Sequence, residues 1–122
     1  LGLAASVISL TVLPRLTDRA ASRLFLTGET IDAAAAERTG LITRAVDDVD
    51  AAVAEFAAHF VGCSPQGLRE SKLLTTHAML AGIEAHRERV VEQSSRLFAS
   101  PEAREGMTAF LERRPPRWAV AP

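Results

Sequence analysis

The chain has 122 residues, of which 48% are apolar and 24% charged, and its 14 basic and 15 acidic residues leave a formal net charge of −1. This length supports one domain core but not two independent ones, and the composition is ordinary for a globular protein. The balanced charge excludes a generally basic surface, so we expect neither nucleic acid nor a membrane as a partner. A lone cysteine, Cys63, excludes an intrachain disulfide and favours a reduced, cytoplasmic protein.

The chain opens on an apolar run, Leu1 to Leu13, that is rich in small residues. The run has no initiator methionine and no basic leader, and it is too short to span a bilayer. It therefore fits neither a signal peptide nor a membrane anchor. We expect instead that the sequence begins inside an apolar segment of a longer protein.

Two short helices are predicted next. Thr17 or Asp18 can cap the first, which ends at the turn around Gly28. Asp32 is a suitable N-cap for the second, and Gly40 is the residue expected just past its end.

A strand and a longer helix complete the first half. Residues 41–46 (LITRAV) are β-branched and bounded by turn residues, so they predict the one strand of the chain. From Val49 to Phe60 apolar residues recur at helical spacing, which indicates an amphipathic helix. Residues 1–62 thus form a mixed α/β piece.

Two Ser-Pro steps, Ser64-Pro65 and Ser100-Pro101, each place an N-cap before a proline at the first helical position. Two successive helices are predicted between them, and a last helix follows that stops before Pro115. The apolar stripes of these three helices are Leu74/Ala78/Ala81, Ile83/Val90/Leu97 and Met107/Phe110/Leu111. Such faces need a partner, so the pattern favours an oligomer.

Three segments carry a resemblance to a known family. Residues 24–42 (LFLTGETIDAAAAERTGLI), 64–74 (SPQGLRESKLL) and 100–114 (SPEAREGMTAFLERR) are similar, in order and spacing, to motifs of the enoyl-CoA hydratase/isomerase (crotonase) superfamily. Together with residues 1–16 they cover nearly the whole chain. The chain therefore resembles the C-terminal part of a crotonase-type protein.

The resemblance implies an α/β fold class. Residues 1–62 would end the crotonase-type spiral of ββα turns, and residues 63–122 would form its three-helix trimerisation region. The chain itself would be mostly α. A homotrimer, or a hexamer of two trimers, is the implied assembly.

The same resemblance implies the activity. Members of the family add water to a 2-enoyl-CoA thioester in fatty acid β-oxidation, using two glutamates and two backbone amides that lie upstream of Leu1 in family order. CoA is part of the acyl-CoA substrate, and no separate cofactor or metal is expected. An isomerase of the same superfamily and a non-catalytic helical assembly fragment stay open as alternatives.

Three residues of this chain match positions that the family uses near its substrate. Residues 1–16 resemble the segment just after the second catalytic glutamate, where the backbone amide of Ser6 would orient water. Ala5 stands where proline is usual there. Phe110 and Arg113 match an aromatic and a basic position that approach CoA from a neighbouring subunit. Being three apart, they are predicted to lie on one side of the last helix.

We interpret the remaining titratable residues as structural. Four carboxylates stand in segments that the family uses for surface or helix structure, and solvated helix charges are the simpler reading. These are Glu29, Glu37, Glu55 and Glu70. His59, His77 and His86 have neither metal-like spacing nor a neighbouring nucleophile, and His86 falls on an apolar stripe as a packing residue.

Overall fold

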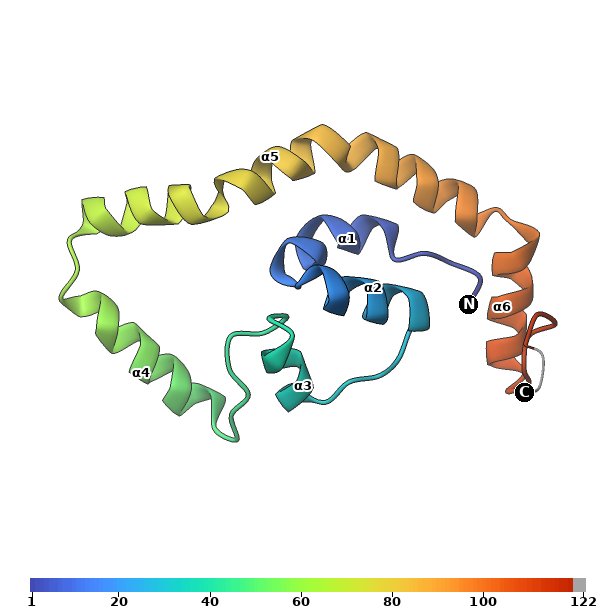
Figure 1. Ribbon diagram of the computed structural model, residues 1–122, viewed down its shortest axis with the longest axis horizontal. Helices are drawn as coiled ribbons and strands as arrows, with labels where there is room; N and C mark the ends of the chain where they lie inside the picture. The colour runs from blue at the N-terminus through green and yellow to red at the C-terminus, as the bar shows by residue number, and fades with distance from the viewer. Residues whose placement is uncertain (120–122) are drawn as a thin grey trace.

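The computed structural model describes residues 1–119, and within that range the chain is helical, without a β-strand (Figure 1). Its elements are α1 (Ser6–Val12), η1 (Leu13–Arg15, a 3-10 helix), α2 (Asp18–Thr27), α3 (Ala33–Arg38), α4 (Val49–Val61), α5 (Pro65–Phe98) and α6 (Pro101–Leu111). The long α5 forms an arch over α1 and α2, with α4 at one end and α6 at the other, beside the N-terminus (Figure 1). The mostly helical character predicted for the chain is confirmed.

Helix starts follow the predicted caps. Thr17, Asp32, Ser64 and Ser100 each accept a hydrogen bond from the backbone N–H three residues on, at 3.3, 2.7, 3.1 and 3.1 Å. Each bond satisfies one of the N–H groups that a first turn leaves without an intrahelical partner. Local chemistry alone therefore placed these four helix starts correctly.

Glycines end α2 and α3 where the sequence predicted them. Gly28 has φ 63° and donates its N–H to Leu24 O at 3.0 Å. Gly40, at φ 83°, passes so close to the Arg15 carbonyl that a Cβ would overlap it. This second glycine thus fixes the chain after α3 against the end of η1.

The predicted strand at residues 41–46 is wrong, because residues 41–43 bend around the end of α3 and the segment has no partner strand within residues 1–119. Side chains hold it instead. The Glu37 carboxylate accepts the Ala45 N–H at 2.8 Å, and Arg44 forks onto Glu55 at 3.2 and 2.8 Å. The Arg44 guanidinium also lies 5.0 Å from the centre of the Phe56 ring. The segment is therefore tied to α3 and α4, not to a sheet.

The two helices predicted between Ser64 and Ser100 are a single helix, α5, of 34 residues. Gly82 stands near the predicted break, and an interior glycine costs a helix only about 1 kcal/mol relative to alanine. Packing outweighs that cost, since α1 lies along α5 and Val90 of α5 is 2% exposed. Two helices, not three, therefore follow Cys63 among the described residues.

Close packing is concentrated at the α6 end. Ala103 and Ala109 are 0% and 1% exposed, and Gly106 between them is buried. A Cβ at Gly106 would overlap the backbone of Leu1, and one at Gly2 (φ 69°) would overlap the Glu102 carbonyl. The N-terminal segment thus lies directly on the small-residue face of α6.

The other end of the molecule is open. The large apolar side chains of α4 are at least 41% exposed, and so are Leu73, Leu74 and Leu80 in the first half of α5, whereas Leu68 and Met79 are half-buried. In the part of the chain described, α4 makes at most sparse contacts with other helices. No helix within residues 1–119 has the length and apolarity to cross a bilayer.

Candidate functional site

The C-terminal end of α6 brings together the largest group of charged side chains. The helix ends in a Schellman turn: Arg113 donates its N–H to Phe110 O at 3.2 Å, and Arg114 donates to Ala109 O at 3.0 Å. Arg113 occupies the left-handed position of this turn, with φ 53°, where glycine is usual.

This geometry corrects one expectation from spacing. Phe110 is still within α6, but Arg113 lies past the helix end, so the two side chains do not share one side of a continuous helix. Both are exposed, Phe110 by 71%. Their backbone hydrogen bond keeps them adjacent on the turn.

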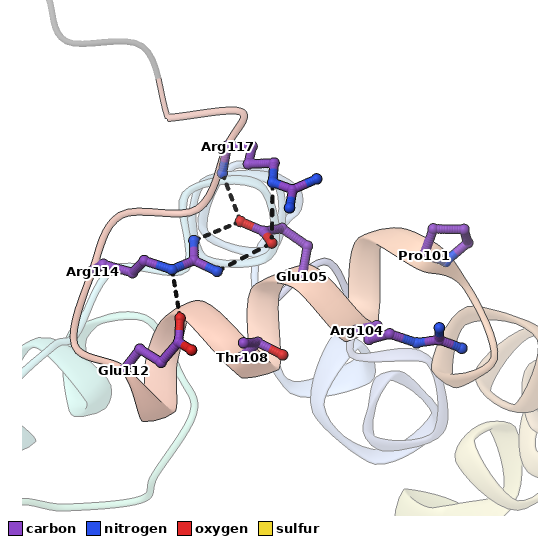
Figure 2. A pocket seen from close by; sticks show the side chains of 7 residues that line it. All are labelled: Pro101, Arg104, Glu105, Thr108, Glu112, Arg114 and Arg117. Carbon is purple, nitrogen blue, oxygen red and sulfur yellow. Dashed lines mark hydrogen bonds and ion pairs between the residues drawn. The ribbon is translucent and has the colours of Figure 1, made fainter.

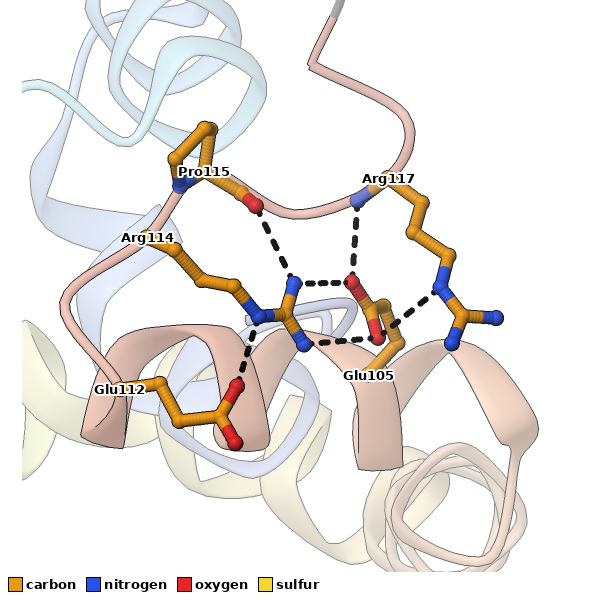
Figure 3. Close-up of polar contacts among 5 residues, drawn as sticks. All are labelled: Glu105, Glu112, Arg114, Pro115 and Arg117. Atoms are coloured by element: carbon orange, nitrogen blue, oxygen red, sulfur yellow. Dashed lines mark hydrogen bonds and ion pairs between the residues drawn. The ribbon is translucent and has the colours of Figure 1, made fainter.

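Glu105 lies at the centre of the polar contacts around this turn (Figure 3). Its two oxygens accept a fork from Arg114 at 2.7 and 3.2 Å, and Oε1 also accepts the Arg117 N–H at 3.0 Å. The Arg117 Nε is 3.6 Å from Oε2. Arg114 also donates from Nε to Glu112 at 2.6 Å, and from Nη1, which already binds Glu105, to Pro115 O at 3.2 Å. One carboxylate therefore holds residues 114–117, here called the tail, against α6.

The electrostatics of this cluster follow from its hydrogen bonds. The Arg114 fork holds the pKa of Glu105 below its usual value, and the Arg117 N–H acts in the same direction. Conversely, hydrogen bonds to Glu105 and then to Glu112 raise the pKa of Arg114. Both groups are charged at neutral pH, and the Glu105 side chain is only 14% exposed. This carboxylate is a structural anion rather than a proton-transfer group.

The cluster forms one wall of an open cavity of about 490 Å³ (Figure 2). The residues around it are Pro101, Arg104, Glu105, Thr108, Glu112, Arg114 and Arg117. Neither Phe110 nor Arg113 lines it. Sequence reasoning missed Glu105, Arg114 and Arg117, because a pairing across a helix end has no fixed spacing. The only available signal was the number of charges in residues 102–117.

Ser6, the predicted water-orienting residue, begins α1 and is 6% exposed. Its backbone N–H donates to Ala4 O at 2.8 Å, with Ala5 between them at φ −75° and ψ 56°. These angles are those of an inverse γ-turn. A water at Ser6 would have to share this N–H with Ala4, so the role stays a prediction.

The four carboxylates given structural readings all have partners. Glu29 pairs with Arg23, and Glu55 with Arg44, and these hydrogen bonds lower the pKa of both carboxyls. Glu70 pairs with Arg69, and Glu37 binds a backbone N–H as described above. A lowered carboxyl pKa is the opposite of what a general acid near neutral pH requires. These contacts support structural roles.

The histidines lie apart from one another. His59 makes an edge contact with Phe56, their ring centres 6.5 Å apart. His86 borders an apolar groove of about 280 Å³ between α1, η1 and α5, but its side chain is exposed, so the prediction that it packs in the interior is wrong. Within residues 1–119 no cluster of three His, Cys, Asp or Glu side chains is placed to hold a metal ion.

Comparison with known proteins decides the family. The model of the enoyl-CoA hydratase/isomerase family matches residues 1–120. The chain belongs to this family. Its fold agrees with a crystal structure of an enoyl-CoA hydratase from Mycobacterium avium, with a TM-score of 0.91 and 53% identity over 97% of this chain and 47% of that one.

Two curated relatives extend the comparison. A probable enoyl-CoA hydratase of Mycobacterium leprae is 35% identical over 100 residues, which are 78% of this chain and 38% of that protein. A mitochondrial Δ(3,5)-Δ(2,4)-dienoyl-CoA isomerase of Dictyostelium discoideum is 33% identical over 99 residues, 79% of this chain and 34% of that protein. This hydratase/isomerase-family chain thus spans less than half the length of its relatives.

Proposed function

We propose that the chain is part of an enoyl-CoA hydratase that adds water to a 2-enoyl-CoA thioester. The observation that carries this proposal is the agreement with the Mycobacterium avium hydratase, at 53% identity along nearly the whole chain. In this proposal the helices of this chain support an acyl-CoA site whose reacting groups lie outside these 122 residues.

The chemistry itself is proposed to come from outside these 122 residues. Two glutamates would activate water and deliver a proton to the α-carbon, while backbone N–H groups hold the thioester oxygen as charge develops on it. The partners found for Glu29, Glu37, Glu55 and Glu70 support this assignment.

Hydration of crotonyl-CoA tests the proposal. The complete native polypeptide that contains this sequence should hydrate crotonyl-CoA, whereas residues 1–122 expressed alone should not exceed the uncatalysed background. Turnover by the isolated 122 residues that survives repurification would refute the location of the chemistry. No turnover by the complete polypeptide would favour the non-catalytic assembly fragment.

An isomerase of the same family is the second candidate, favoured by the similarity to the Dictyostelium dienoyl-CoA isomerase. The complete polypeptide should be offered a 3-enoyl-CoA and a 3,5-dienoyl-CoA beside crotonyl-CoA. Conversion of either with a higher kcat/KM than crotonyl-CoA hydration would replace the hydratase assignment.

We further propose that Phe110 and Arg113 contact the nucleotide end of CoA. The C-terminus of α6 carries the negative end of the helix dipole, so a phosphate approaches it only if cations outweigh that field. Glu105 and Glu112 already engage Arg114 and Arg117, while no ion pair is found for Arg113 within residues 1–119. The exposed Arg113 is therefore the available guanidinium beside the exposed Phe110.

Replacing Arg113 tests this contact. In the complete polypeptide Arg113→Ala should raise KM for a CoA thioester about tenfold and change kcat little, because the nucleotide lies far from the reacting bond. The matching pantetheine thioester, which lacks the nucleotide, should be unaffected. Arg38→Ala, an exposed arginine on α3 away from this turn, is the matched control. An equal rise in KM for the CoA thioester and the pantetheine thioester would show that Arg113 has a structural role and does not contact the nucleotide.

We propose a homotrimer, or a hexamer of trimers, with residues 63–122 as the assembly region and residues 1–62 as the end of the spiral core. Exposed apolar side chains on α5 and α6, among them Leu74, Leu80 and Leu111, support this, since covering apolar surface stabilises by about 25 cal/mol per Å². Sedimentation of the complete polypeptide at micromolar concentration tests it. A clean monomer would count against the proposal.

A further inference from the structure

Arg113 holds an unusual backbone conformation for its residue type. It is the only residue other than glycine with a positive φ within residues 1–119. A side chain in the left-handed region is disfavoured, and such a residue persists only when its surroundings hold it there. The contacts that hold Arg113 are therefore informative about its role.

The chain is bound to α6 both before and after Arg113. Before it, α6 ends in the backbone hydrogen bonds of the Schellman turn. After it, the Arg114 guanidinium forks onto Glu105 and the Arg117 N–H donates to the same carboxylate. With the residue before and the residues after it both fixed to α6, the direction in which the chain leaves Arg113 is fixed as well.

Charge pairing separates Arg113 from its neighbours. Glu105 and Glu112 engage the arginines at 114 and 117, as Figure 3 shows. Of the three arginines in this turn, only Arg113 is left exposed and without an ion pair among the described residues. The cluster thus concentrates the uncompensated positive charge of the turn on one side chain.

We propose that Glu105 is a positioning residue for anion binding: it holds the tail through Arg114 and Arg117 so that Arg113 is presented to the phosphate of an acyl-CoA. This proposal rests on the proposed function, since it assigns Arg113 the phosphate contact. Glu105 itself touches no substrate and acts only through the turn.

The test is a double-mutant cycle in the complete polypeptide. Glu105→Gln keeps the size of the side chain but removes the charge that binds the Arg114 fork. It should raise KM for a CoA thioester several-fold, leave kcat unchanged and leave KM for the pantetheine thioester unchanged. Because Glu105 acts through Arg113, the double variant Glu105→Gln/Arg113→Ala should be no worse than Arg113→Ala alone.

Two further variants keep the test decisive. Arg114→Lys retains the charge but replaces a two-point fork with one contact, and it should reproduce part of the Glu105→Gln effect. Glu102→Gln, an exposed carboxylate in the first turn of α6, is the matched control and should change nothing. Circular dichroism and sedimentation verify that each variant folds and assembles. If Glu105→Gln does not fold, Arg114→Lys carries the test.

The outcomes separate the two proposals. If Arg113→Ala leaves both thioesters unchanged, the CoA contact of the proposed function fails, and the positioning role fails with it. If Arg113→Ala raises KM for the CoA thioester but Glu105→Gln and Arg114→Lys do not, only the positioning role is overturned. Additive losses in the double variant would also overturn it, because they would show that Glu105 acts independently of Arg113.

Discussion

The two ends of α5 are packed in different ways. At its C-terminal end, α6 and the N-terminal segment approach so closely that Gly2 and Gly106 leave no room for a Cβ. At its N-terminal end, Leu74 is 80% exposed, and Phe60 of α4 is 55% exposed. Small residues allow backbones to meet within one chain, whereas large apolar residues left in solvent indicate that another surface must cover them. At the closed end (residues 1–4 and α6) backbones meet within one chain, although Phe110 and Leu111 there stay 71% and 80% exposed. The open arm (α4 and residues 65–77) leaves most of its large apolar side chains in solvent.

Gly106 gives the largest expected effect at the closed end. In the complete polypeptide Gly106→Ala should lower the free energy of unfolding by about 3 kcal/mol, because the added Cβ meets the Leu1 backbone, which cannot move aside as a side chain could. Gly82→Ala is the matched control, since a Cβ there meets nothing within 4 Å, and it should stabilise by up to about 1 kcal/mol. Denaturant unfolding measures both. Similar values for the two variants would show that α6 is not held against residues 1–4.

Replacing Leu74 tests whether the open arm takes part in association. Leu74→Asp should weaken association of the complete polypeptide by about 2 kcal/mol per subunit, the value of burying one leucine. Leu26→Asp is the control, because Leu26 is 85% exposed on α2, outside the arm. Sedimentation over a concentration series compares the two. Equal weakening would remove the distinction between the arm and the rest of the surface.

The two Ser-Pro caps compare the ends at a smaller scale. Ser100→Ala should cost about 1 kcal/mol of global stability, because α6 is part of the closed end. Ser64→Ala removes an equivalent hydrogen bond but should act mostly on the first turn of α5, which opens locally. Hydrogen exchange distinguishes global from local loss. A local loss for Ser100→Ala together with a global loss for Ser64→Ala would contradict the proposed difference between the two ends.

The smallest expected effect is that of pH on two ion pairs. Contacts with Arg114 and Arg44 lower the folded-state pKa of Glu105 and Glu55 below the ordinary value of 4.5. Each pair therefore contributes fully above pH 4.5, and the contribution is lost as pH falls through the lowered pKa. Added salt should diminish the Glu55 contribution more, because its side chain is 59% exposed against 14% for Glu105. Denaturant unfolding of Glu55→Gln, Glu105→Gln and the unchanged protein, above and below pH 4.5 and at two ionic strengths, measures both effects.

Sequence reasoning succeeded where the physics is local. The caps at Thr17, Asp32, Ser64 and Ser100 depend on a side chain and a backbone N–H three residues apart. Gly28 and Gly40 were recognised as helix ends because only glycine adopts a positive φ without strain. The family motifs likewise lie within short stretches, and the family match over residues 1–120 confirms the resemblance.

It failed where a distant partner decides the outcome. Residues 41–46 have the composition of a strand, but a strand needs a second strand, and Glu37 and Glu55 hold this segment instead. The break predicted near Gly82 is absent because packing of α5 against α1 outweighs a helix propensity of about 1 kcal/mol. A local preference is a small energy that tertiary contacts readily exceed.

The sequence by itself determined where most helices begin and end, that the chain is mostly helical, and to which family it belongs. Tertiary structure alone decided that α5 is continuous, that α6 rests on the N-terminal segment through Gly106, and that Glu105 gathers the tail around Arg113. The physical reason is range: caps and turns join residues a few positions apart, whereas these contacts join segments whose meeting depends on the path of the whole chain.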